Sequence, residues 1–123
     1  MIRAMIVDDE ADLRLVLRLA LEQRNEGLAV AGEAAGGDEA LQQLDDVDPT
    51  VVVLDQMMPG MDGLETAARI LERRPDQLIV LYSAFCDAAL EEQARQAGIT
   101  VCVRKGRAKD LAELVHQLGS GAA

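Results

Sequence analysis

The chain has 123 residues, which fits one domain, and it carries 12 Lys and Arg residues against 22 Asp and Glu residues, a formal net charge of −10 at pH 7. This negative field repels nucleic acid phosphates and anionic membrane surfaces, which argues against direct binding of the chain to either. The two cysteines form no C-x-x-C pattern and no apolar run approaches the ~20 residues that span a bilayer, so we expect a cytoplasmic protein with reduced thiols, without a zinc site, a disulfide framework or a membrane span.

Short apolar runs alternate with amphipathic stretches along the whole chain. In chain order, the predicted strands are Met5–Val7, Leu28–Val30, Val51–Leu54, Leu78–Tyr82 and Val101–Val103. Helical spacing of apolar residues follows the first, third and fifth runs, at Leu13, Val16, Leu17, Ala20; Leu64, Ala67, Ala68, Leu71; and Leu111, Leu114, Val115, Leu118. Breaks between these segments fall at Gly27, Gly36–Gly37, Pro75 and Gly98. Five strand–helix units in succession predict an α/β fold with a parallel sheet covered by helices on both faces.

Polar residues stand just past four of the five predicted strands. Asp8 and Asp9 follow the first strand, Asp55 the third and Ser83 the fourth, while Lys105 lies just beyond the fifth. Because the carboxyl ends of parallel strands share the edge of the sheet where ligands bind, we expect these side chains to meet there. Three carboxylates so close repel one another, by as much as about 4 kcal/mol per pair at 4 Å in an effective dielectric of 20. The lysine offsets part of this repulsion, and a hard divalent cation, Mg²⁺ being the best fit, would offset the rest.

The same set of groups is suited to phosphoryl transfer. That reaction needs in-line positioning and charge stabilisation, which a metal ion, a lysine and a hydroxyl donor can supply. A carboxylate at the centre of such a site acts as a nucleophile and becomes a phospho-aspartate. The residues themselves therefore favour Asp55, at the end of the most apolar strand, as a phosphoryl acceptor.

Four motifs in this order closely resemble the receiver domain of two-component response regulators. They are Ile6–Glu10, Val53–Gly63, Ser83–Ala84 and Lys105. The resemblance extends over essentially the whole chain and implies a flavodoxin-like (βα)5 three-layer sandwich with the parallel strand order 2-1-3-4-5. It also implies a receiver domain over residues 1–118, followed at 119–123 by a flexible tail or the start of a linker.

The resemblance assigns a role to each polar residue at the strand ends. Asp55 is similar to the phosphoacceptor, and Asp9 and Asp55 to direct Mg²⁺ ligands. Asp8 would bind the ion through water, and the main-chain carbonyl of Met57 would complete the protein's share of the ligands.

The remaining roles implied by the resemblance fall on the last two strands. Lys105 would bind a phosphoryl oxygen as a point charge, and Ser83 would donate a hydrogen bond to that oxygen and draw the following loop inward. Two positions depart from the family pattern: Cys102 stands where an aromatic residue is usual, and Gly106 stands where proline usually follows the lysine. Without proline we expect a trans peptide bond and a looser approach of the lysine. The switch would then use backbone and helix shifts alone, or Phe85 would take over the packing role.

The implied function is that of a signalling phosphoacceptor, not of an enzyme with turnover. A sensor histidine kinase or a histidine phosphotransfer protein would donate the phosphoryl group. The surface of the fourth helix, fifth strand and fifth helix would transmit the signal and could support a homodimer. The stretch Leu28–Ala34 resembles receivers joined to LuxR-like helix-turn-helix modules, so the chain is a fragment of such a regulator or a stand-alone receiver.

Three other functions compete with this interpretation. A haloacid-dehalogenase-like phosphatase needs a second aspartate where this chain has Met57, and a flavodoxin needs a phosphate-cradling loop where it has Asp8–Glu10. The strongest alternative is a binding-only pseudo-receiver, because the usual aromatic and proline are missing.

Leu15 and Leu19 lie off the inward stripe of the first helix, where they would contact a phosphodonor or simply pack at the edge.

Overall fold

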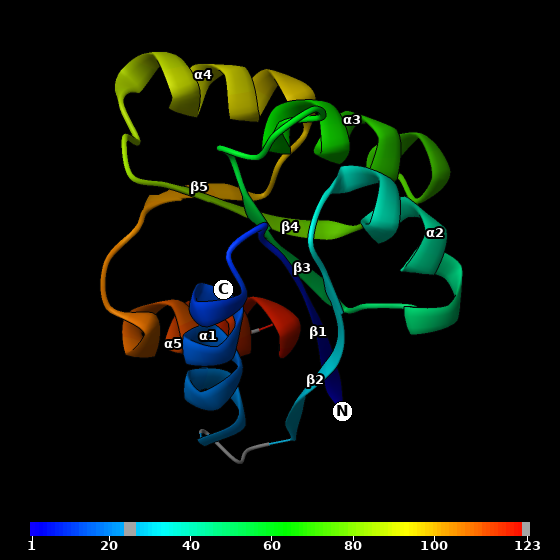
Figure 1. Cartoon of the computed structure of the whole chain (residues 1–123), viewed down its shortest axis with the longest axis vertical. Coiled ribbons are helices and arrows are strands. Elements are labelled where there is room, and N and C mark those ends of the chain that lie inside the picture. Colours follow the sequence, from blue (N-terminus) through cyan, green and yellow to red (C-terminus); the bar gives the residue numbers. More distant parts are fainter. Residues whose placement is uncertain (24–26, 122–123) are drawn as a thin grey trace.

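A five-stranded parallel sheet runs between two layers of helices in the computed structural model, which describes residues 1–23 and 27–121 (Figure 1). The strands are β1 (Ile2–Val7), β2 (Leu28–Ala34), β3 (Val51–Asp55), β4 (Leu78–Ser83) and β5 (Val101–Arg104). The helices are α1 (Ala11–Gln23), α2 (Gly37–Val47), α3 (Gly63–Arg73), α4 (Ala88–Ala97) and α5 (Ala108–Gly119). The sheet order is β2-β1-β3-β4-β5, which confirms the predicted flavodoxin-like fold. Within the described ranges, no helix is long and apolar enough to cross a membrane.

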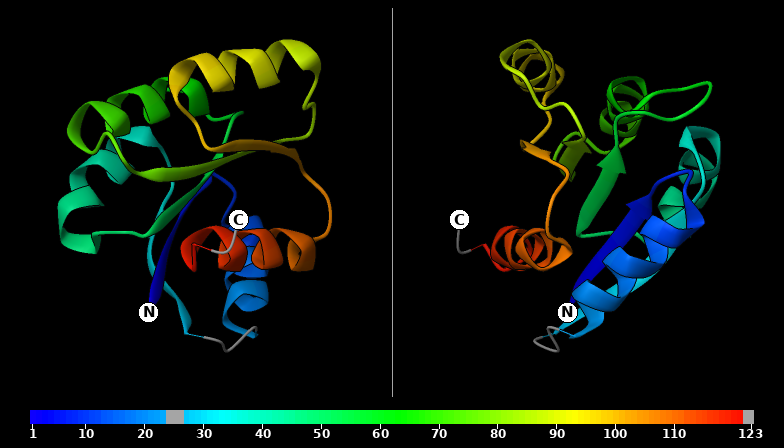
Figure 2. Two further views of the ribbon diagram at one scale, coloured as in Figure 1. Left: turned by 180° about the vertical axis from the view of Figure 1, so that it is seen from behind. Right: turned by 60° about the vertical axis from the view of Figure 1, so that its left-hand side comes forward.

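The helices divide unequally between the two faces of the sheet. Helices α1 and α5 cover one face, and α2, α3 and α4 cover the other (Figure 2). Strand β3 lies in the middle, so its successive side chains pack alternately into the two cores: Val51 and Val53 toward α1 and α5, Val52 and Leu54 toward the other three helices. This burial on both faces explains the unbroken apolar run in the sequence.

Each strand is longer than its predicted apolar run, by one residue in β3, β4 and β5 and by three or more in β1 and β2. Strand β1 begins at Ile2 because Arg3, although polar, is held in place: its guanidinium donates to the Val47 carbonyl oxygen at the end of α2, 2.6 Å from Nη2. Strand β2 continues to Ala34 through Gly32 and Glu33. It is an edge strand that pairs only with β1, so it needs fewer apolar residues than a central strand.

The helices begin and end at capping residues and glycines in the sequence. Asp62 and Asp87 cap the amino ends of α3 and α4, where their carboxylates accept from the backbone N–H groups of Glu65 and Leu90. Gly98 ends α4 in the left-handed conformation, with φ of 87°. Helix α5 runs to Gly119, and residues 122–123 of the predicted tail lie outside the described residues.

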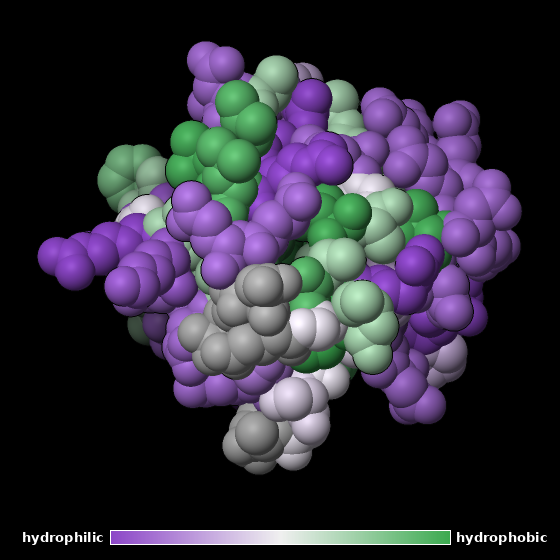
Figure 3. All heavy atoms as spheres, turned by 90° about the horizontal axis from the view of Figure 1, so that it is seen from below, coloured by the Kyte–Doolittle hydropathy of each residue, from purple (hydrophilic) through white to green (hydrophobic). Residues whose placement is uncertain are grey.

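Helix α1 has more exposed apolar surface than its sequence pattern predicts. Leu15 and Leu19 are 55% and 52% exposed, as expected for residues off the inward stripe. Val16 was predicted to face inward and is 50% exposed, so that assignment is wrong. The buried residues of α1 are Leu17 and Leu21, because α5 covers only part of this helix. Seen from below, the molecule shows hydrophobic patches among hydrophilic side chains (Figure 3).

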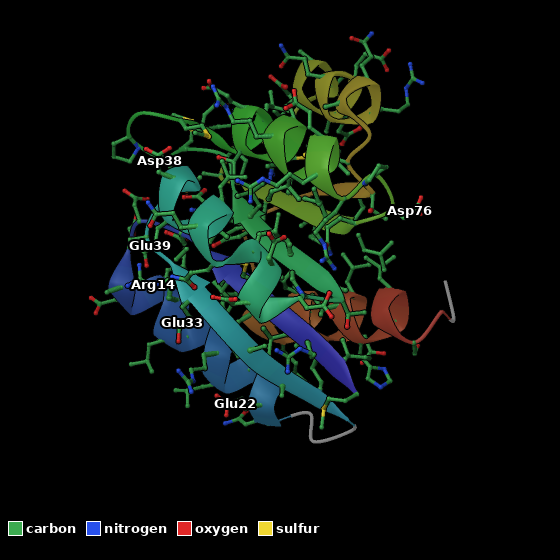
Figure 4. All side chains as sticks on the ribbon, turned by 90° about the vertical axis from the view of Figure 1, so that its right-hand side faces the viewer. Arg14, Glu22, Glu33, Asp38, Glu39 and Asp76 are labelled. Carbon is green, nitrogen blue, oxygen red and sulfur yellow. The ribbon has the colours of Figure 1, made fainter. Side chains whose placement is uncertain are left out.

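Salt bridges join α1 to the edge strand. Arg14 and Arg18 of α1 both reach Glu33 of β2, at 3.5 Å and 2.7 Å between their closest nitrogen and oxygen atoms. Figure 4 labels Arg14 and Glu33, which lie close together on neighbouring elements. Such exposed pairs contribute at most about 1 kcal/mol each, so their main effect is to orient Arg14.

Candidate functional site

The predicted acidic cluster forms where β1 and β3 end. Asp8, Asp9 and Asp55 each present one carboxylate oxygen, and these oxygens all lie within 4.8 Å of one another. Asp8 and Asp55 are buried, at 0% and 1% exposure, whereas Asp9 is exposed. Burial strengthens the mutual repulsion of the carboxylates, because water screens it less. A cation bound among the three carboxylates would therefore relieve this repulsion.

Three hydrogen bonds, from the loop after β1, from β4 and from α1, hold Asp8 in place. One carboxylate oxygen accepts from the backbone N–H of Glu10 at 2.8 Å, and the other accepts from the hydroxyl of Tyr82. Its main-chain carbonyl accepts from Arg14 Nη1 at 2.6 Å. The first turn of α1 and the end of β4 thus fix the position of this aspartate.

The loop after β3 is shaped around Asp55. The Met57 backbone N–H donates to Asp55 Oδ1 at 3.2 Å. The side chain of Gln56 spans the loop, accepting from the Leu64 N–H at 2.9 Å. At Gly63 the chain passes so close that a Cβ atom would lie 2.5 Å from the Asp55 carbonyl oxygen, so only glycine fits this position without movement.

Lys105 reaches the cluster from the end of β5. Its ammonium nitrogen lies 3.1 Å from Asp55 Oδ1 and 3.9 Å from Asp8 Oδ2. The Lys105–Gly106 peptide bond is trans, as predicted, and no bond among residues 1–23 and 27–121 is cis. Lys105 approaches closely, and the backbone N–H of Lys105 donates to the Ser83 carbonyl at 2.8 Å, which anchors this residue to β4.

Tyr82 is a site residue that sequence reasoning missed. Its ring is 2% exposed, its hydroxyl donates to Asp8, and the Lys105 ammonium lies 5.1 Å from the ring centroid. Burial raises the pKa of this phenol, so the hydroxyl stays protonated and remains a donor. The available signal was a tyrosine next to a strand end, since a buried tyrosine hydroxyl usually has a hydrogen-bond partner.

Ser83 is the last residue of β4, one position beyond the predicted end of this strand at Tyr82, and it is buried at 2% exposure. Its hydroxyl oxygen accepts from the backbone N–H of Phe85 at 3.3 Å, so it shapes the loop that leads into α4. Phe85 is 79% exposed, so a packing role for its ring would require the ring to move when the site is phosphorylated. Cys102 packs at the margin of the core under α4.

Burial and the Lys105 ammonium act in opposite directions on the pKa of the Asp55 carboxyl. Burial raises the pKa of its carboxyl above the ordinary value; Lys105 opposes this shift, and the charge of Asp8 adds to it. A cation bound beside this buried carboxylate would offset its desolvation cost. The arrangement can thus bind a divalent ion and present a carboxylate oxygen for attack on an electrophile.

Comparisons with known proteins agree with this geometry. The sequence model of the family described as response regulator receiver domain matches residues 4–117. The positive alginate biosynthesis regulatory protein of Pseudomonas aeruginosa is 35% identical over 113 residues, which cover 92% of this chain and 45% of that protein. The chain therefore spans less than half the length of this curated relative.

Solved structures of similar chains match over nearly the full length. The receiver domain of the response regulator NarL from Mycobacterium tuberculosis has a TM-score of 0.87 and 30% identity, covering 98% of this chain and 97% of that one. A LuxR-family two-component response regulator from Aurantimonas sp. has a TM-score of 0.88 and 28% identity, covering 97% of this chain and 85% of that one.

Proposed function

Because the chain belongs to the response regulator receiver domain family, we propose that Asp55 is its phosphoacceptor in two-component signalling. The observation that carries this assignment is the position of the Asp55 carboxylate: buried at the end of β3, beside Asp8 and Asp9, and 3.1 Å from the Lys105 ammonium.

The donor set fits Mg²⁺. Asp9 and Asp55 would be direct ligands, Asp8 would act through water, and the Met57 main-chain carbonyl would complete the protein's share. Three carboxylates within reach of one another carry more negative charge than the single ammonium of Lys105 offsets. When bound, the ion would neutralise this charge and accept a phosphoryl oxygen.

The chain's own residues would perform the transfer as follows. A carboxylate oxygen of Asp55 attacks the phosphorus of a phosphohistidine; a P–O bond forms, the P–N bond breaks, and the leaving imidazole takes up a proton from water. Lys105 stabilises the charge on the transferred group, and Ser83 rotates its hydroxyl away from the Phe85 N–H to donate to a phosphoryl oxygen. The product is an acyl phosphate on Asp55.

A binding-only pseudo-receiver explains the site less well than a phosphoacceptor does. Every acidic residue of the site is present, and the lysine makes direct contact with Asp55 despite the missing proline. Turnover of a separate substrate is also disfavoured, since Met57 stands where a phosphatase of the haloacid dehalogenase type has its general acid. The chain would assist only its own phosphorylation and dephosphorylation.

We propose that the donor is a sensor histidine kinase or a histidine phosphotransfer protein and that the chain acts in the cytoplasm. Its docking surface would be the exposed apolar side of α1, Leu15, Val16 and Leu19. A cavity beside this surface is lined by residues of α1, β5 and α5 and reaches Tyr82 and Lys105, so it connects the surface to the site.

The output is proposed from the length of the relatives and the charge of the chain. The receiver unit would span residues 1–118, with 119–123 leading away from it as a tail or linker. The receiver would signal through the surface of α4, β5 and α5, and the same surface could form a homodimer. DNA would be bound by a separate transcription module and not by the receiver, because the receiver's net charge of −10 opposes contact with phosphates.

The test is Mg²⁺-dependent binding of beryllofluoride, which mimics a phosphoryl group on a carboxylate. We expect saturable binding by the parent, no binding by Asp55→Asn, and unchanged binding by Asp76→Asn. Asp76 is a matched control because it lies in the loop between α3 and β4 (Figure 4). This loop is at the amino end of β4, whereas the acidic cluster is at the carboxyl ends of the strands. A parent that fails to bind, or an Asp55→Asn variant that binds equally well, would remove the assignment.

A further inference from the structure

Two thiols that are 16 residues apart in the sequence lie close together between α4 and β5. Cys86 lies in the loop between β4 and α4, and Cys102 lies on β5. Their sulfur atoms are 3.1 Å apart, and both thiols are free and half-buried. Strand β5 pairs with β4, with Cys102 opposite Leu81, so the loop that leaves β4 passes close to Cys102.

We propose that Cys86 and Cys102 form a reversible intramolecular disulfide when the protein meets a peroxide, and that this bond ties the loop after β4 to β5. The sulfur atoms of a disulfide lie about 2.05 Å apart, so the two thiols must approach by about 1 Å. Cys86 can supply this movement because its loop has no regular structure, while the pairing of β5 with β4 holds Cys102 in place.

The charge around the thiols selects the class of oxidant. The Cys86 sulfur lies 3.7 Å from Glu91 Oε1, Asp87 is its neighbour in sequence, and the whole chain carries a net charge of −10. An anionic oxidant such as glutathione disulfide is repelled by this field. Hydrogen peroxide is neutral and small enough to reach half-buried sulfur, so it is the oxidant that the surroundings admit.

The order of the two steps follows from the environment of Cys102. Cys102 packs against the core under α4, where burial raises the pKa of its thiol, whereas Cys86 lies in an irregular loop that a small oxidant reaches more easily. Cys86 therefore reacts first: its thiolate attacks one peroxide oxygen, the O–O bond breaks, and the hydroxide that leaves takes up a proton to become water.

The second step closes the bond. The Cys102 sulfur attacks the sulfur of the Cys86 sulfenic acid; the S–S bond forms, the S–O bond breaks, and the hydroxide leaves as water with the Cys102 proton. Overall, two thiols lose two hydrogen atoms and one peroxide is reduced to two water molecules. A dithiol reductant restores both thiols.

A disulfide here would act on the loop that follows Ser83 and contains Phe85. The loop is already held at its ends, by the Lys105 N–H to the Ser83 carbonyl and by the Asp87 cap of α4. The disulfide would fix its middle. The following consequence rests on the proposed function: since Ser83 must turn toward a phosphoryl group on Asp55, oxidation would oppose the phosphorylated conformation.

The direct test treats the reduced protein with hydrogen peroxide and records the intact mass and the free thiol content. We expect the parent to remain monomeric, lose two hydrogen atoms and both free thiols, and regain them with a dithiol. Cys86→Ser and Cys102→Ser should each fail to lose two hydrogens within one chain. Retention of both thiols, gain of oxygen without loss of hydrogen, or a disulfide between two chains would overturn the proposal.

A second measurement separates the disulfide from the phosphoacceptor assignment. Amide hydrogen exchange in residues 84–87 should slow about tenfold on oxidation, whether or not Asp55 accepts a phosphoryl group. Beryllofluoride should then bind the oxidised parent more weakly than the reduced parent. Equal exchange rates would overturn the tie between loop and strand. Binding by neither form, with slowed exchange, would overturn the phosphoacceptor assignment and leave the disulfide standing.

Discussion

The hydroxyl of Tyr82 donates a hydrogen bond to the carboxylate of Asp8 at the buried floor of the acidic cluster. This contact joins the end of β4 to the end of β1 across β3, which lies between them in the sheet. It also satisfies one oxygen of a carboxylate that is 0% exposed. The tyrosine is thus part of the site, although it cannot itself bind the metal ion as a phenol.

Replacing Tyr82 by phenylalanine should lower the free energy of unfolding of the metal-free protein. The ring and its contact with Lys105 remain, but a buried carboxylate loses one hydrogen bond, which costs about 1.5–3 kcal/mol for a charged acceptor. Urea unfolding of the parent and of Tyr82→Phe, both without Mg²⁺, measures this difference. A change below about 0.5 kcal/mol would show that the hydrogen bond contributes little.

The raised pKa of Asp55 predicts a pH-dependent cost in stability. The folded protein binds this proton more tightly than the unfolded chain, so the contribution of Asp55 to stability is full below the ordinary carboxyl pKa of about 3.9 and is lost as pH rises through the folded value. Asp55→Asn should therefore unfold at higher urea concentration than the parent at pH 7 without Mg²⁺. This advantage should shrink as pH falls toward 4.

Magnesium provides the control for that prediction. Addition of Mg²⁺ at pH 7 should raise the stability of the parent more than that of Asp55→Asn, because only the parent retains all three carboxylates of the cluster. Equal stabilisation of both proteins by Mg²⁺ would contradict the assignment of Asp55 as a ligand.

Gly63→Ala should distort the loop that leaves Asp55. The new Cβ atom would lie 2.5 Å from the Asp55 carbonyl oxygen and 2.8 Å from the Gln56 Cα, and neither backbone atom can move aside easily. We expect a loss of about 1–3 kcal/mol in the free energy of unfolding. Gly36→Ser is the matched control, since a Cβ there has nothing within 4 Å and serine suits this helix-capping position. Equal losses in the two variants would refute the steric argument.

The exposed side of α1 can be tested with two phosphodonors. Leu15→Ala combined with Leu19→Ala removes apolar surface without touching the acidic cluster. We expect transfer from a phosphohistidine protein that phosphorylates the parent to slow by about tenfold, equivalent to about 1.4 kcal/mol of binding. Transfer from acetyl phosphate should stay unchanged, because a small donor does not contact α1. Equal rates from the protein donor would exclude this surface from docking.

Much of the fold could be predicted from the sequence because its signals are local. The apolar run Val51–Leu54 identified the central strand, and Gly98 marked the end of α4. The strand order came from a family resemblance and not from periodicity, since a hydrophobic pattern does not say which strands are neighbours. The error at Val16 has the same origin: helical spacing shows a stripe, but not how much of it another helix covers.

The candidate site was predictable only as far as strand ends determine it. Asp8 and Asp9 follow β1 and Asp55 is the last residue of β3, so parallel topology alone brings them together. Tyr82 lies within its strand, and its contact with Asp8 depends on which face of β4 it occupies. The proximity of Cys86 and Cys102 depends in turn on the path of a loop, which no sequence pattern specifies.

The most direct test of the account is chemical phosphorylation of the purified chain. The parent is incubated with acetyl phosphate and Mg²⁺, its intact mass is recorded, and the modified residue is identified by peptide mapping. We predict the addition of one phosphoryl group, located on Asp55, labile to alkali, dependent on Mg²⁺ and absent from Asp55→Asn. A parent that gains no phosphoryl group, or an Asp55→Asn variant that gains it to the same extent, would contradict the central claim.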